Sequence, residues 1–208
     1  MTMDAVATTN FIHVFEPGTD AGRAPLLLLH GTGGDERDLL PLGRMVAPGA
    51  SLLSPRGKVL EGAMPRFFRR LAEGVFDEAD LTARTHELAD FVMESRERHG
   101  LPAPIALGFS NGANIAASLL LLRPEVLAGA ALLRAMSPFR QPPSADLAGK
   151  RVLMLSGALD PIIPAADSEW LARTLSGNGA IVDHRILPTG HGLSQADVGL
   201  VRDWLVKG

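Results

Sequence analysis

The segment Gly108-Phe109-Ser110-Asn111-Gly112 constrains the fold of this chain more than any other. It follows the apolar run 104–109 and opens the Ala-rich stretch 113–122, so it lies between a predicted strand and a predicted helix. Gly-x-Ser-x-Gly at such a junction is the pattern of a nucleophile elbow. The turn is so sharp that the serine backbone is strained and only glycine fits two residues to either side. The hydroxyl would stand above a sheet edge, beside a helix N-terminus that favours negative charge.

Short apolar runs alternate with longer helical patterns along the chain. Strands are predicted at 11–15, 25–29, 51–54, 105–109, 129–133, 152–155 and 182–187, and helices at 36–46, 78–99, 111–122, 165–176 and 194–206. Most of the strands are continuously apolar, as in parallel strands that are covered on both faces. The pattern predicts a single α/β domain, 1–208, with a mostly parallel central sheet and helices on both faces.

A serine hydroxyl is a weak nucleophile, so it needs a general base and a third group that orients the base. After a nucleophile elbow these groups follow in the order Asp or Glu, then His. Only His184 and His191 follow Ser110 in the chain. His184 lies within a predicted strand, whereas His191 lies between two glycines in the loop after the last strand, so His191 is the predicted base. Its alternative role is to cap the final helix.

Asp160 is the predicted acidic partner of the base. It directly follows a predicted strand and precedes a proline that ends the strand. Ligands of parallel sheets bind at the carboxyl ends of strands, where this residue lies. Its alternative interpretation is an ordinary turn aspartate, which Asp-Pro pairs commonly supply.

Two preorganised N–H groups are needed to stabilise an oxyanion. One is predicted to be the N–H of Asn111, which follows the serine. The other is predicted in the Gly-rich loop after the buried strand at 26–29, with Thr32 N–H preferred and Gly33 N–H as the alternative. His30 is expected to brace this loop. A phosphate site is disfavoured, because the loop lacks both the P-loop and the dinucleotide-binding patterns.

Composition excludes several other classes of protein. The chain has no cysteine, which excludes thiol nucleophiles and cysteine-based zinc sites, and its histidines are scattered, so no metal and no cofactor are predicted. The net charge is −3 without a basic stripe, so nucleic acid is not an expected partner, and Arg66, Arg69 and Arg70 are expected on a solvated face or pocket rim. No apolar run could insert into a membrane, and residues 1–10 lack a secretory pattern, so a cytoplasmic location is expected.

Together these segments resemble the α/β-hydrolase fold and, within it, the lidless phospholipase/carboxylesterase family of small bacterial esterases and acyl-protein thioesterases. The resemblance rests on residues 30–36, 108–112, 157–161 and 190–192, which occur in the family's order across nearly the whole chain. It implies the same triad and main-chain donors as the residue argument. It also implies a small-molecule ester as the substrate and, from the habit of the family, a homodimer.

The segment 65–70 resembles the aromatic stretch that bacterial esterases of this family place beside the acyl pocket. An apolar acyl pocket is predicted from five residues, with core or rim packing as the alternative for each: Phe67, Phe68, Met136, Ile162 and Ile163. Acyl-protein thioesterases usually carry Trp-Phe-Asp where this chain has Phe67-Phe68 alone, which favours small-molecule esters over protein depalmitoylation. The connection 135–150, where related folds insert a cap, is short and proline-rich, so no cap domain is expected.

The predicted function is that of a serine carboxylesterase that hydrolyses short- to medium-chain acyl esters through an acyl-enzyme. The same activated serine would serve thioesters, so an acyl thioesterase is the alternative. A non-catalytic binding protein is a further alternative, because a fold alone does not prove chemistry. It is disfavoured, since the sequence lacks no member of the triad.

Overall fold

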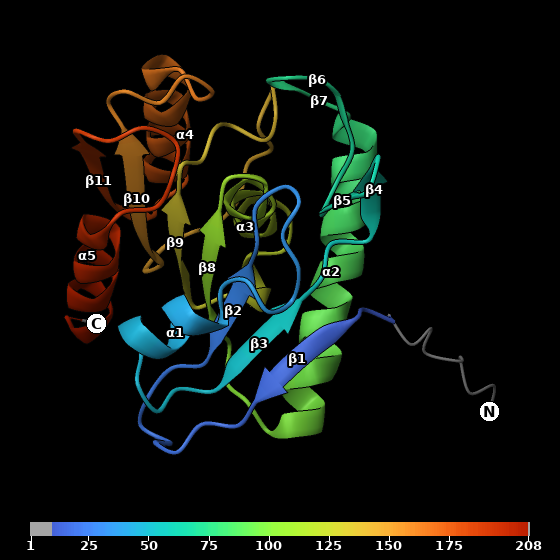
Figure 1. The fold of residues 1–208 in the computed structure, drawn as a ribbon, viewed down its shortest axis with the longest axis vertical. Coiled ribbons are helices and arrows are strands. Elements are labelled where there is room, and N and C mark those ends of the chain that lie inside the picture. Colours follow the sequence, from blue (N-terminus) through green and yellow to red (C-terminus); the bar gives the residue numbers. More distant parts are fainter. Residues whose placement is uncertain (1–9, 208) are drawn as a thin grey trace.

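The computed structural model describes residues 10–207, which form a seven-stranded sheet in the order β1-β3-β2-β8-β9-β10-β11 (Figure 1). Only β1 is antiparallel to its neighbour, and all other pairs are parallel. The predicted, mostly parallel sheet is therefore confirmed. Residues 1–9, which belong to the segment in which no secretory pattern is expected, lie outside the described part of the chain. The strands are His13–Glu16 (β1), Leu26–Leu29 (β2), Leu52–Pro55 (β3), Ile105–Phe109 (β8), Gly129–Leu133 (β9), Arg151–Gly157 (β10) and Ile181–Leu187 (β11).

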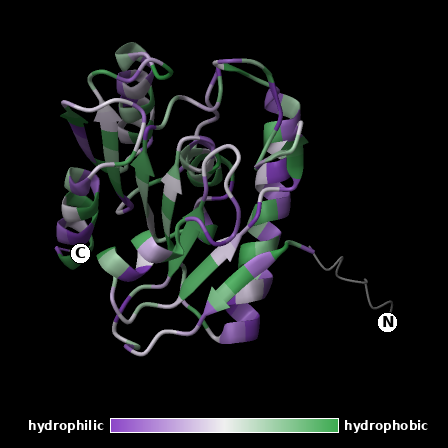
Figure 2. Ribbon diagram, viewed as in Figure 1, coloured by the Kyte–Doolittle hydropathy of each residue, from purple (hydrophilic) through white to green (hydrophobic). Residues whose placement is uncertain are grey.

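Helices cover both faces of the sheet, as predicted. One face packs against α2 (Glu78–His99), α3 (Asn111–Leu122) and α4 (Ala165–Gly177), and the other against α1 (Leu40–Val46) and α5 (Gln195–Val206). Successive strand residues point to opposite faces, so Leu27 and Leu29 join one core while Leu26 and Leu28 join the other. Figure 2 shows the hydrophobic colouring concentrated in the central strands.

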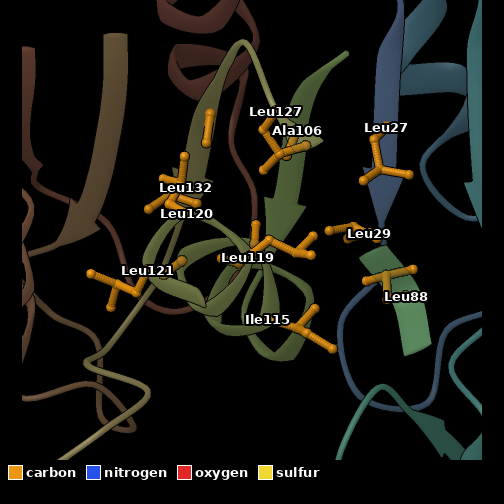
Figure 3. Packing of buried hydrophobic residues seen from close by; sticks show 14 of the residues in the cluster. Leu27, Leu29, Leu88, Ala106, Ile115, Leu119, Leu120, Leu121, Leu127 and Leu132 are labelled. Atoms are coloured by element: carbon orange, nitrogen blue, oxygen red, sulfur yellow. The ribbon is translucent and has the colours of Figure 1, made fainter. Parts of the chain in front are cut away.

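The helix α3, which follows Ser110, lies at the centre of the larger core. Every residue from Asn111 to Leu121 is buried, as expected for a helix that is apolar on all sides. Figure 3 shows Ile115 and Leu119 of α3 among side chains from β2, β8, β9 and α2. This packing fixes the direction in which the N-terminus of α3 points, and with it the place of Ser110.

The helix boundaries follow local signals in the chain. Both ends of α2 are as predicted, because the Asp77 side chain caps its N-terminus and Gly100 ends it with a left-handed φ of 63°. The predicted start of α1 at residue 36 is wrong by four residues. Pro41 has no N–H and fits only the first turn of a helix, so α1 begins at Leu40.

Two small hairpins between β3 and α2 are not predicted from the sequence. They pair Val59–Glu61 (β4) with Met64–Arg66 (β5), and Arg70–Ala72 (β6) with Val75–Phe76 (β7). Strands of two or three residues are too short to show an alternating pattern. We call residues 56–77 the hairpin segment. Although β1 and β2 are consecutive in the chain, they are not neighbours in the sheet, because β3 lies between them.

No helix among residues 10–207 combines the length and the apolar character that a membrane crossing requires. The connection from β9 to β10 contains no helix, so the expected absence of a cap domain is confirmed.

We predict that Leu119→Ala lowers the free energy of unfolding by about 2–5 kcal/mol, because it leaves a cavity at the centre of the larger core. Urea denaturation followed by circular dichroism measures this change. The matched control is Leu60→Ala, whose side chain is 67% exposed and whose effect should stay within about 0.5 kcal/mol. Equal effects of the two substitutions would contradict the central role of α3.

Candidate active site

Ser110 lies on a strained turn between β8 and α3. Its φ of 52° and ψ of −115° are rare for a residue with a side chain, and its N–H donates to Leu133 O at 2.8 Å. Neither flanking glycine leaves room for a Cβ. A Cβ on Gly108 would lie 2.6 Å from Gly112 O, and one on Gly112 would lie 2.0 Å from Leu29 O. The turn therefore requires both glycines and raises the Ser110 hydroxyl above the sheet.

The structure brings Ser110, His191 and Asp160 together, from the ends of β8 and β10 and from the loop after β11. His191 Nε2 lies 3.0 Å from Ser110 Oγ, and His191 Nδ1 lies 2.8 Å from Asp160 Oδ2. Because an ionised carboxylate can only accept hydrogen bonds, the proton is assigned to Nδ1 and the lone pair of Nε2 faces the serine. The arrangement can remove the hydroxyl proton of Ser110.

Asp160 is held in its ionised form. Its side chain is 1% exposed, and this burial alone would raise its pKa. Hydrogen bonds from the N–H of Ile162 at 2.8 Å, from His191 and from the N–H of Ile163 at 3.1 Å outweigh the burial and lower the pKa of Asp160. The carboxylate can thus stabilise a protonated His191.

The Gly-rich loop after β2 distinguishes between the two candidate oxyanion donors. Gly33 N–H donates to Pro65 O at 2.9 Å, so this group is already satisfied. Within residues 10–207, neither the Thr32 N–H nor the Asn111 N–H has a hydrogen-bond acceptor. The structure therefore favours Thr32 over Gly33.

His30 connects the Gly-rich loop to the hairpin segment. Its Nε2 accepts the N–H of Gly57 at 3.0 Å, which leaves Nδ1 as the donor to Gly31 O at 2.7 Å. This pattern requires a neutral imidazole with its proton on Nδ1, and burial lowers the pKa of His30. The loop is braced as the sequence analysis expects.

Arg66 differs from the solvated or rim position expected for it. Its side chain is 3% exposed, with Nη1 donating to Thr32 Oγ1 at 2.7 Å and Nε to Phe68 O at 3.2 Å. Next to it, Phe67 N–H donates to Asn111 Oδ1 at 2.8 Å. Both predicted oxyanion residues are thus fixed by side-chain bonds to the hairpin segment.

The five predicted pocket residues do not share one surface. Phe67 and Phe68 pack into the larger core and are 2% and 0% exposed, which favours the alternative of core packing for both, and Phe67 contacts His30. Ile163 is also buried, whereas Ile162 is partly exposed beside Asp160. Met136 borders a groove of about 300 Å³ between β6–β7, residues 136–140 and α4, which Phe76, Phe139 and Trp170 also line.

In the part of the chain that the structure describes, no three His, Asp or Glu side chains are placed to hold a metal ion together. The polar groups of the site are the side chains of Asp160, His191 and Ser110 and the N–H groups of Thr32 and Asn111.

No family model matches the chain. It is 49% identical over 194 residues to MhqD of Bacillus subtilis (strain 168), whose name places it among the hydrolases; the match covers 92% of this chain and 96% of the relative. The structure of a carboxylesterase of Bacillus cereus is 48% identical, with a TM-score of 0.92 and coverage of 95% and 94%. The chain belongs to the carboxylesterase family of α/β-hydrolases. A second carboxylesterase, from Mesorhizobium loti, is 38% identical, with a TM-score of 0.91 over 98% of both chains.

As a carboxylesterase, this protein is a hydrolase with esterase function, and its fold is the α/β-hydrolase fold without a cap. The family motifs can be recognised in the sequence. The burial of Arg66 and Arg134 cannot, because no motif signals an arginine whose partners are distant in the chain.

We predict that this carboxylesterase loses stability through His30 as the pH falls. The folded pKa of His30 lies below its unfolded value near 6.5, so the unfolded chain binds more protons. The stability is fully present above about pH 6.5 and is lost below it, by up to about 1.4 kcal/mol per pH unit. Unfolding free energies of wild type and His30→Gln from pH 5 to 8 measure the effect, and the variant should show the shallower slope.

The exposed His86→Gln on α2 is the matched control and should keep the wild-type profile. Parallel profiles for wild type and His30→Gln would contradict the neutral, bracing role of His30.

Proposed function

We propose that this carboxylesterase hydrolyses short- to medium-chain acyl esters through a covalent acyl-enzyme, with Ser110 as the nucleophile, His191 as the base and Asp160 as its partner. The observation that supports this best is the continuous hydrogen-bonded chain Asp160–His191–Ser110, with heavy-atom separations of 2.8 and 3.0 Å. These separations lie within the range in which a positioned base can take a proton.

In the proposed reaction, Ser110 Oγ forms a bond to the carbonyl carbon of the ester while its proton moves to His191 Nε2. The carbonyl π electrons become the lone pair of an oxyanion, which the N–H groups of Thr32 and Asn111 bind. The bond to the leaving alkoxide then breaks, and His191 returns its proton to that oxygen. An acyl-Ser110 ester and a free alcohol result. Asp160 stabilises the imidazolium while it exists.

In the second half of the reaction, water takes the place of the alcohol and hydrolyses the acyl-enzyme. His191 Nε2 takes a proton from the water, whose oxygen bonds to the acyl carbon, and the second oxyanion forms at the same two N–H groups. Its collapse breaks the bond to Ser110 Oγ, which recovers the proton from His191. The products are the carboxylic acid and the free enzyme.

The groove beside Met136 supports a substrate of limited size. Met136 N–H donates to Asn114 Oδ1 at 3.0 Å, and Asn114 N–H donates to Ser110 O at 3.0 Å, so two hydrogen bonds connect the groove wall to the nucleophile. The groove of about 300 Å³ is lined by the apolar side chains of Phe76, Phe139 and Trp170 and by the charged side chains of Glu78, Arg140 and Asp167. We assign it to the acyl chain of a small-molecule ester.

We predict that Ser110→Ala abolishes hydrolysis of p-nitrophenyl esters, from acetate to decanoate, with a loss of about 10⁴-fold or more in kcat. Release of p-nitrophenol measures the rate. The acyl chain length that wild type hydrolyses fastest indicates how long a chain the groove accommodates. The matched control is Ser176→Ala, an exposed serine on α4, which should keep wild-type kinetics.

Equal rates in wild type and Ser110→Ala would contradict the proposed nucleophile. If wild type hydrolyses acyl thioesters but no oxygen ester, the thioesterase alternative replaces the ester substrate. If wild type hydrolyses neither and does not react with a fluorophosphonate probe, the proposed acyl-enzyme at Ser110 is wrong, and the non-catalytic alternative is favoured.

A further inference from the structure

Arg134, the residue directly after β9, is fully buried beneath the loop that carries His191. Its side chain is 0% exposed and its φ is 56°, a left-handed value that is unusual for a residue with a side chain. Such a conformation persists only where the surrounding structure holds it. The strain turns the chain away from the sheet at the point where the guanidinium enters the space below the loop.

The guanidinium binds the main chain on both sides of His191. Nε donates to Gly190 O at 3.1 Å and Nη2 donates to Gly192 O at 3.1 Å. Nη2 also lies 3.2 Å from Thr189 Oγ1, and Nη1 donates to Leu155 O at 3.1 Å. One rigid, planar group thus fixes the two peptide carbonyls that flank His191 and connects them to β10.

Asp197 of α5 compensates the buried charge of Arg134. It is 1% exposed and accepts two hydrogen bonds from the guanidinium, from Nη1 at 2.8 Å and from Nη2 at 2.9 Å. Asp197 also accepts hydrogen bonds from the N–H and the hydroxyl of Ser194, which form a capping box at the start of α5. Arg134 therefore connects the His191 loop, which runs from β11 to α5, both to β10 and to the start of α5.

The neighbour of Arg134 holds the nucleophile. Leu133 O accepts the N–H of Ser110 at 2.8 Å, and the N–H of the same peptide group, that of Arg134, donates to Leu155 O at 2.8 Å. Consecutive residues of one strand end thus fix the backbone of Ser110 and the backbone around His191. The distance between the nucleophile and its base depends on this short connection.

We propose that Arg134 is a positioning residue for the general base: it sets where His191 Nε2 stands relative to Ser110 Oγ by binding the carbonyls of Gly190 and Gly192. This inference rests on the proposed role of His191. Gly190 and Gly192 have no side chains that could hold the backbone on either side of His191, so its position there depends on hydrogen bonds to the main chain. A displacement of the base by about 1 Å can lower the rate by about 10²-fold.

A purely structural role would require only the ion pair with Asp197. Arg134→Lys separates the two roles. A lysine ammonium can still pair with Asp197, but as a single point it cannot reach both flanking carbonyls at once.

We predict that Arg134→Lys lowers kcat for p-nitrophenyl butyrate by about 10- to 100-fold and leaves KM within about twofold, because the base is misplaced while the substrate groove is intact. The rate of fluorophosphonate labelling should fall in parallel. In proton NMR, the downfield signal of the His191 Nδ1 proton, assigned by its absence in His191→Gln, should broaden or disappear. The matched control is Arg123→Lys, whose partners Asp90 and Glu125 lie far from this loop in the fold.

Thr189→Val is the second variant, because it removes one acceptor of Arg134 and leaves the ion pair in place. It should lower kcat in the same direction by about 2- to 10-fold. If Arg134→Lys folds and keeps wild-type kcat and the wild-type proton signal, the inference is wrong. If Arg134→Lys does not fold, unchanged kcat and an unchanged signal in Thr189→Val overturn it.

The proton signal does not depend on turnover. If wild type hydrolyses no ester, the proposed substrate fails, while the signal in Arg134→Lys still decides whether Arg134 positions His191.

Discussion

The close contact between α3 and the end of β2 determines where every other part of the site can lie. Gly112 approaches Leu29 O so closely that no side chain fits between them. This contact places the N-terminus of α3 directly beside the start of the Gly-rich loop, which begins at His30. The N–H of Asn111 and the loop with Thr32 are therefore brought to the same edge of the sheet as Ser110. A side chain at position 112 would move Ser110 away from the N–H group of Thr32, the proposed oxyanion donor of the Gly-rich loop.

The hairpin segment supports this arrangement from outside the sheet. Four of its groups bind residues of the Gly-rich loop or of the elbow: Gly57 to His30, Pro65 to Gly33, Arg66 to Thr32 and Phe67 to Asn111. Three of the four contacts use main-chain atoms of the segment, so they depend on its path more than on its side chains. In a fold without a cap, these hydrogen bonds hold the Gly-rich loop in place from outside the sheet.

The sequence predicts those parts of the fold whose signals are local. The ends of α2 and α3 and the strands at 105–109 and 129–133 are confirmed, because capping residues and continuous apolar runs mark them. The three residues of the proposed triad can be selected from the sequence, because each lies in a family motif that follows the end of a predicted strand. The remaining features depend on distant contacts. Phe68 is buried by packing that no local pattern records, and Arg134 meets Asp197 across 63 positions.

The charges around the site match the charges that would develop in the proposed reaction. Arg134 and Asp197 neutralise one another, so their pair can orient the His191 loop without adding net charge beside the imidazole. Beside Thr32 the balance differs, since Arg66 and Arg70 share a single carboxylate, Glu61, at 3.3 and 2.7 Å. Arg66, whose side chain is 3% exposed, is the charged group that contacts the loop itself, through Thr32 Oγ1 at 2.7 Å. A neutral ion pair therefore lies under the imidazole, and a buried guanidinium lies behind the Gly-rich loop.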